Sequence, residues 1–223
     1  KALESSLAVF DAADFSKASE TTLASSGTHL SNMQSCGGTV GPYAAIAEEA
    51  CNWAKVTGST TRYDWSSDVD TVMVSLGRQQ RVSDDLVIGL STAYEGSRFR
   101  ASGRSASGYR LYLGAIAKVS QGPVYGSVSL NGSYGSGKAE RLISSAGTAY
   151  VARSRPSTLA LASRLRAGVL AKAGQIDVIP SVELDLAVLQ DGWDCARLCG
   201  SGCPDCAQWP AAHCLAAGLS CAG

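Results

Sequence analysis

Residues 159–188 read LALASRLRAGVLAKAGQIDVIPSVELDLAV, and this stretch decides the fold. In its first half, apolar side chains occupy one parity, whereas Arg164 and Arg166 occupy the other. In its second half the alternation returns, with Glu183 and Asp185 at polar positions. Successive side chains of a strand point to opposite faces of a sheet. The stretch therefore predicts two strands, each with an apolar and a polar face, joined by a short turn.

The same alternation extends toward the N-terminus. It persists for about a dozen residues in the best segments, which exceeds the ~5–6 residues of a typical soluble strand. A tilted strand needs ~9–11 residues to cross a bilayer. We expect seven strands in an antiparallel up-and-down meander, at residues 52–59, 69–80, 86–94, 109–120, 124–134, 159–169 and 176–188.

The expected links between these strands alternate in length. Long links are expected at residues 60–68, 95–108 and 135–157, and short turns at residues 81–85, 121–123 and 173–175. Outer-membrane barrels have short turns on one side of the membrane and longer loops on the other, whereas the Greek-key links of soluble sandwiches follow no such rhythm. The fold class is therefore predicted as all-β: part of an outer-membrane β-barrel, preceded by a short helical segment.

The two parities predict two environments. An Arg that faces lipid at mid-bilayer costs ~2–4 kcal/mol, so the charged parity is expected to face a water-filled lumen. The residues expected to face the lumen are Arg110, Lys118, Arg164, Arg166, Asp177, Glu183 and Asp185. Those expected to face lipid are Val72, Val74, Leu76, Leu111, Leu113, Leu165, Val182, Leu184 and Leu186. For any single strand, the solvated face of a soluble sheet remains an alternative.

Composition excludes several classes of function. The 223 residues carry 19 basic and 19 acidic side chains, and this zero net charge does not suggest nucleic-acid binding. His29 and His213 have no acid placed to orient them, and no G-x-S-x-G, P-loop or dinucleotide fingerprint occurs. We expect no enzymatic activity, no cofactor and no metal in the strand region.

The N-terminal part, residues 1–50, is predicted to be a helical linker or pore-entry segment. Leu3, Leu7 and Phe10 form an apolar stripe at helical spacing, and a second short helix is expected from about Thr21. The sequence starts without Met, so we interpret it as a fragment of a longer protein, in which the lack of a visible signal peptide says nothing about export. Cys36 and Cys51 are a candidate disulfide, with two buried thiols as the alternative.

The C-terminal tail, residues 191–223, has a different composition. Strand alternation stops there, and six of the eight cysteines lie in it. We interpret the abrupt change near residues 190–193 as a shift of the translated reading frame. Two alternatives stay open: a disulfide knot, and a zinc site, which the ligand types permit. Its candidate ligands are Cys195, Cys199, Cys203, Cys206, His213 and Cys214.

Residues 51–186 resemble the C-terminal β-barrel of the autotransporters, the type V secretion translocators of Gram-negative outer membranes. The resemblance is carried by Cys36 and by five segments. These are CNWAKV at 51–56, VSLGRQ at 74–79, LVIGLSTAY at 86–94, GYRLYLG at 108–114 and VIP at 178–180. The resemblance implies a twelve-stranded barrel with a helix threading its pore and an N-terminal passenger exported to the cell surface. It also implies three partners: the passenger, outer-membrane lipid and the outer-membrane assembly machinery.

The chain departs from the family pattern in strand number. Seven strands are recognised, and the terminal aromatic residue of the family is absent. We therefore expect a truncated barrel, with unpaired edges that oppose stable insertion on its own. A soluble β-sandwich adhesin or binding module and a passive outer-membrane pore are the alternative functions.

Overall fold

The computed structural model describes residues 12–34, 50–64, 67–101, 104–145, 148–173 and 176–194. One helix and nine strands make up this part of the chain. They are α2 (Ala12–Gln34), β1 (Cys51–Asp64), β2 (Ser67–Ser83), β3 (Leu86–Ala101), β4 (Arg104–Gln121), β5 (Val124–Ser145), β6 (Thr148–Val169), β7 (Ala171–Ala173), β8 (Ile176–Val178) and β9 (Ser181–Asp194).

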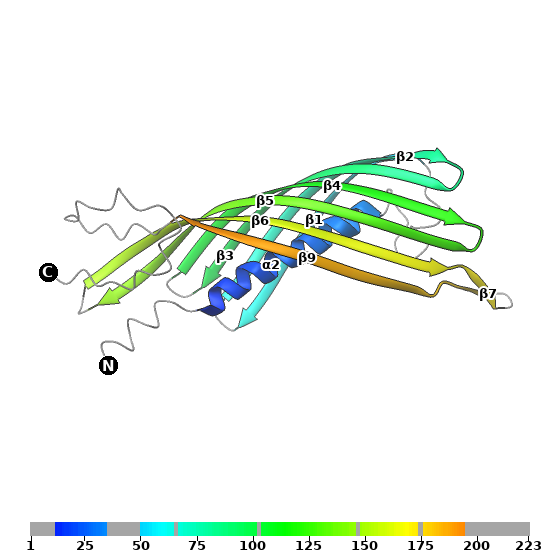
Figure 1. Cartoon of the computed structure of the whole chain (residues 1–223). Coiled ribbons are helices and arrows are strands. Elements are labelled where there is room, and N and C mark those ends of the chain that lie inside the picture. The colour runs from blue at the N-terminus through cyan, green and yellow to red at the C-terminus, as the bar shows by residue number, and fades with distance from the viewer. Residues whose placement is uncertain are drawn as a thin grey trace.

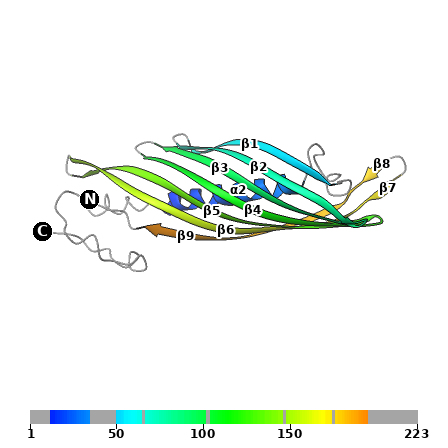
Figure 2. The ribbon, with the colours of Figure 1, turned by 90° about the horizontal axis from the view of Figure 1, so that it is seen from above.

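Seven of the strands form a single antiparallel sheet. Its order, β1-β2-β3-β4-β5-β6-β9, follows the chain, and β7 and β8 form a separate hairpin before β9. The long strands are twisted and curved, and α2 lies along one face of the sheet (Figures 1 and 2). The predicted all-β meander with an N-terminal helix is confirmed.

The strands are longer than the alternation predicts, and the prediction of three long links is wrong. Most of their residues continue the ladders: Ser97 lies opposite Gly108, and Glu140 lies opposite Arg153. These segments are rich in Ser, Gly and charged residues and lack an apolar parity, so their periodicity did not reveal them. Backbone hydrogen bonds hold a ladder whatever its side chains. The sheet therefore has tight turns at one end and long hairpins at the other.

Tight turns close the sheet at the first of these ends. Gly122 has φ 59°, a value that suits the first central residue of a type II′ turn, and Pro123 fits the second. The backbone N–H of Leu170 donates to Pro123 O at 2.7 Å, and that of Val169 donates to Pro180 O at 3.1 Å. The first bond joins the start of the β7–β8 hairpin to the neighbouring turn, and the second closes the base of that hairpin.

The strand predicted at residues 176–188 is divided in two. Residues 179–180 separate β8 from β9, and Pro180 has no N–H to continue a ladder. Asp177 therefore lies in the small hairpin and not on the strand that carries Glu183 and Asp185, and its side chain is outside the described part. Strand β9 runs to Asp194, past the predicted limit of the sheet at residue 190.

Helix α2 is one continuous element of 23 residues, longer than the short helix expected from Thr21. Serine and threonine are weak helix formers, so propensity alone underestimates it. The stripe at Leu3, Leu7 and Phe10 lies outside the described residues. In the described part, no helix is long and apolar enough to cross a membrane.

The apolar core lies between the helix and the sheet and is small. Leu30 and Met33 of α2 pack with Trp53 and Ala162. Trp53 has only 6% of its surface exposed, so it lies beneath the helix and not on the apolar, exposed face of the sheet. Its parity turns it toward the helix, where Gly77 leaves room: a Cβ at Gly77 would collide with the indole ring.

Candidate functional site

The seven-stranded sheet has two faces of opposite character. On the face away from α2, large apolar side chains are exposed; Leu113 and Val182, for example, are 72% and 75% exposed. On the face toward α2, polar side chains are buried, and Ser75 and Ser129 are 0% exposed. We call these the outer face and the helix-side face. The arrangement is the inverse of a soluble sheet, which buries its apolar face.

All nine residues predicted to face lipid lie on the outer face, with exposed fractions between 40% and 75%. They come from strands β2, β4, β6 and β9. Strands β3 and β5 extend the same surface with Ile88, Leu90, Val128 and Leu130. Because a contiguous exposed apolar surface of this extent is unusual, it indicates an apolar environment or partner.

Three exposed tyrosines lie on the outer face where its apolar band ends. Tyr94 and Tyr134 both stand opposite Leu111 in the registers of β3–β4 and β4–β5, so they belong to one row. Tyr109 lies one row farther toward the long hairpins, and its ring stacks on that of Tyr94 with centroids 6.4 Å apart. We call these residues the tyrosine row. Aromatic residues flank the apolar band of outer-membrane barrels in this way.

On the helix-side face, Arg110 of β4 is the central polar contact. Its guanidinium donates to Thr22 Oγ1 of α2 at 2.8 Å, to Thr158 Oγ1 of β6 at 2.6 Å and to Ser133 Oγ of β5 at 3.3 Å. Arg110 is 8% exposed. Buried charges are stable only when hydrogen-bonded, so this residue ties the helix to three adjacent strands.

A second buried pair lies beside Arg110. Tyr112 Oη donates to Glu95 Oε2 at 3.0 Å, and the two side chains are 0% and 4% exposed. The ring of His29 from α2 lies 5.1 Å from that of Tyr112, and its Nε2 is 3.2 Å from Ser91 Oγ. The sheet therefore meets the helix over β3 and β4 through hydrogen-bonded polar side chains, although the buried Nδ1 of His29 has no partner there.

The C-terminal end of α2 is held by donors from the sheet. Lys118 Nζ donates to Gln34 O at 2.6 Å, Gln79 Nε2 to Met33 O at 2.6 Å, and Lys55 Nζ to Asn32 O at 3.1 Å. The last turn of the helix contains no basic residue of its own. Its free carbonyls carry the negative end of the helix dipole, so the sheet supplies the cap that the helix lacks.

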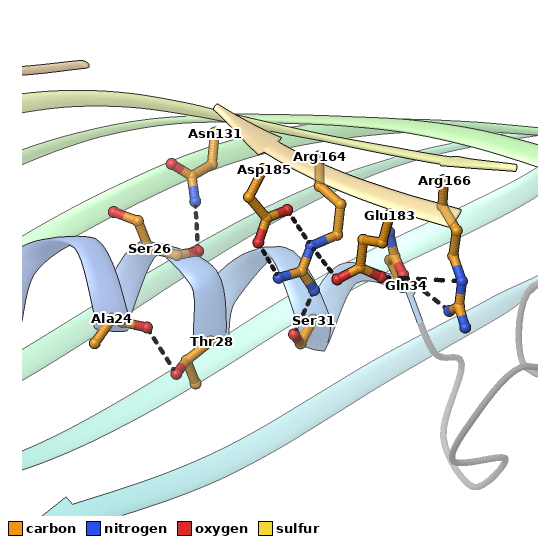
Figure 3. Close-up of polar contacts among 10 residues, drawn as sticks. All are labelled: Ala24, Ser26, Thr28, Ser31, Gln34, Asn131, Arg164, Arg166, Glu183 and Asp185. Atoms are coloured by element: carbon orange, nitrogen blue, oxygen red, sulfur yellow. Dashed lines mark hydrogen bonds and ion pairs between the residues drawn. The ribbon is translucent and has the colours of Figure 1, made fainter. Parts of the chain in front are cut away.

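Strands β6 and β9 add a charged cluster along the helix (Figure 3). Arg164 donates to both carboxylate oxygens of Asp185 at 2.7 Å and to Ser31 Oγ of α2 at 2.7 Å. Glu183 lies between the two arginines, 3.2 Å from Arg164 Nε and 3.9 Å from Arg166 Nε. The acids are partly exposed, and the cluster lies where β9 forms the edge of the sheet.

Close packing also fixes the helix on β4 and β5. Asn131 Nδ2 donates to Ser26 O at 3.0 Å in a buried contact. At Gly114, an added Cβ would collide with the sulfur of Met33 and come within 2.7 Å of Ser91 Oγ. Glycine at this position therefore lets the helix approach the sheet.

Six of the seven charged residues predicted for the lumen lie on the helix-side face, and all except Asp177 are in the sheet. Sequence reasoning missed Lys55, Gln79, Glu95, Tyr112 and Asn131. Their parity places them on the same face, but only the position of α2 shows that they meet a helix. Among the described residues, no group of His, Cys, Asp or Glu could hold a metal.

Cys51 forms a disulfide in the structure. Cys36 lies outside the described residues, so its pairing with Cys51 stays a prediction. The tail cysteines and His213 also lie outside them, as do the alternatives proposed for that tail.

A model of the autotransporter β-domain family matches residues 52–191. The fold is similar to that of the translocator domain of autotransporter NalP from Neisseria meningitidis, with a TM-score of 0.56 and 13% sequence identity. The match covers 81% of this chain and 60% of that one, and at this identity it shows the fold alone. A search of curated proteins found no match. Since the family match covers more than half of its residues, the chain belongs to the autotransporter β-domain family.

Proposed function

We propose that this chain is the translocator part of an autotransporter: it anchors in a Gram-negative outer membrane and supports export of a passenger on the N-terminal side of α2. The observation that carries the proposal is the distribution of side chains on the sheet: apolar side chains are exposed on one face, and polar side chains are buried on the other face, which packs on α2. Family membership supports the membrane setting and the direction of the passenger.

The apolar band has the height that a membrane requires. On β4 it extends from Tyr109 to Val119, which are ten residue steps apart and so about 33 Å along the strand. Barrel strands tilt by ~35–45°, which reduces this length to about 25 Å across the membrane. That value is the typical height of the apolar band in outer-membrane barrels.

The orientation of α2 supports export toward the long hairpins. Thr21 lies beside Tyr63, at the end of the sheet with the long hairpins. Gln34 lies beside Lys118, near the tight turns. In outer-membrane barrels the tight turns face the periplasm and the longer connections face outside. A passenger that precedes α2 would then lie on the cell surface.

The proposed mechanism is physical and not catalytic. Lipid contacts the outer face, while the helix-side face offers hydrogen bonds that replace water around the polar side chains of α2. The expected partners are the passenger and outer-membrane lipid. The assembly machinery of the outer membrane is a further expected partner on the strength of the family alone.

The alternatives are less consistent with these contacts. A soluble β-sandwich would cover the apolar face with a second sheet, and no described element covers it. A passive pore would leave its lumen open, whereas α2 lies along the polar face and bonds to it from Thr22 to Gln34.

Circular dichroism and heat-modified gel mobility of the full chain test the proposal, with and without an uncharged detergent. We expect a β-rich spectrum and a mobility shift only in detergent, because only detergent covers the outer face. A β-rich monomer that stays soluble in plain buffer would refute the translocator assignment.

A further inference from the structure

A row of cations crosses the outer face just beyond the tyrosine row. Arg98 of β3 lies opposite Ser107, which lies opposite Lys138 of β5. The β5–β6 register, with Ser136 opposite Ser157, brings position 155 beside position 138. Arg98, Lys138 and Arg155 are exposed, and we call these three residues the basic row.

Neighbouring acids are already engaged with other groups. Asp70 stands directly opposite Arg98 in the β2–β3 register, but its carboxylate accepts from Thr60 Oγ1 at 2.9 Å and lies 3.7 Å from Arg100. Glu140 is paired with Arg153 at 2.9 Å. Among the described side chains, no acid pairs with the basic row. Asp194 of β9 stands opposite Arg155 in the backbone register, so acidic positions border the row at both of its ends.

The depth of the basic row matches that of lipid headgroups. Arg98 follows Tyr94 by four residues, about 13 Å along the strand and about 10 Å along the membrane normal at the usual tilt. Tyr109 lies one row nearer to Arg98 than Tyr94 does, so the distance from Arg98 to Tyr109 along the membrane normal is about half of this value. The headgroup region of a bilayer is ~5–8 Å thick on each side, so the side chains of the row reach its phosphates.

We propose that the basic row binds the phosphate groups of anionic lipids in the leaflet beside the tyrosine row. The proposal rests on the proposed function, since it requires lipid on the outer face. Arg forms bidentate hydrogen bonds with phosphate, and Lys adds a point charge. Arg98 lies two strands from Lys138, about 10 Å away, so a headgroup with two phosphates can engage both of these cations.

Lipid binding to the full chain in dodecyl maltoside micelles tests this proposal. The probes are dioctanoyl phosphatidic acid and dioctanoylglycerol, which share their acyl chains and differ in the phosphate; native mass spectrometry reports the affinity. Each cation near a membrane surface contributes roughly fivefold to the binding of an anionic lipid. We expect the unaltered chain to bind the phosphatidic acid about a hundredfold more tightly than the neutral lipid.

Two double variants with the same change of net charge provide the control. R98Q/R155Q removes two members of the basic row and is expected to lower the affinity for phosphatidic acid about 25-fold. R100Q/R153Q removes two arginines from the next row, which are paired with acids, and is expected to lower it less than threefold. Equal losses in the two variants would overturn the proposal.

Two further outcomes separate this proposal from the proposed function. Heat-modified mobility is measured before lipid is added, and a chain that does not fold in micelles refutes the proposed function and the basic row with it. A folded chain without preference for phosphatidic acid overturns the basic row alone. Competition by millimolar inorganic phosphate at equal strength would also overturn it, because the site would then bind free anions.

Discussion

At the scale of single residues, Arg110 connects four elements on the helix-side face. Its hydrogen bonds reach α2, β5 and β6 from a buried position on β4. Each hydrogen bond to a charged group contributes about 1.5–3 kcal/mol. Arg110→Gln is expected to lower the free energy of unfolding by about 3 kcal/mol, read from urea titrations in detergent. The exposed Arg98→Gln is the control, with an expected change within about 0.5 kcal/mol; equal effects would contradict a special role for Arg110.

Glycine at position 114 is the other residue on which the helix position depends. Gly114→Val would push against Met33 and Ser91, so the helix must move away from β4. We expect α2 to become cleavable by protease while the β spectrum of the sheet is retained. Gly132→Val on the outer face, where nothing lies within 4 Å of an added Cβ, should leave α2 protected. Protection of α2 in both variants would show that this contact does not fix the helix.

Side-chain parity could be read from the sequence, but the partner of each residue could not. Alternation placed Arg164, Glu183 and Asp185 on one face, and the structure brings them into one cluster. The same face also holds Trp53. Its contact with Leu30 and Met33 depends on the depth and rotation of α2, which no local pattern encodes.

At the scale of elements, α2 depends on the sheet for its C-terminal cap. Lys118→Met removes the donor to Gln34 O and a positive charge near the negative end of the helix dipole. We expect the last turn of α2 to lose protection against hydrogen exchange by about tenfold, whereas the amides near Thr22 keep theirs. Lys118→Arg should restore much of it. Unchanged exchange in the Met variant would show that the cap is not needed.

Strand length was the element-level property that the sequence predicted least well. Apolar alternation found the membrane-height part of each strand and stopped where Ser, Gly and charged residues begin. The hairpins beyond the tyrosine row are held by backbone ladders and by exposed pairs such as Arg153–Glu140. Such pairs contribute little and leave no periodic signal. The break at Pro180 could have been anticipated, since proline interrupts a ladder.

At the scale of the whole molecule, the account explains why one chain carries both an exposed apolar surface and a buried polar one. The sheet separates an apolar environment at its outer face from a polar one at its helix-side face, and α2 lies on the polar side. Among the described strands, β1 and β9 are the edges of the sheet, and lipid could not satisfy the outward backbone donors and acceptors of an edge strand. In a membrane, these edges must therefore be paired.

Photo-crosslinking with p-benzoylphenylalanine tests the central claim most directly, since it reports what each face touches. The residue is placed at Leu113 or Leu130 on the outer face, and at Ser129 or Asn131 on the helix-side face, in the full chain folded with lipid. We predict that the outer positions crosslink to lipid acyl chains and that the helix-side positions crosslink to α2 peptides. Lipid adducts at Ser129 and Asn131, or none at Leu113 and Leu130, would contradict the account.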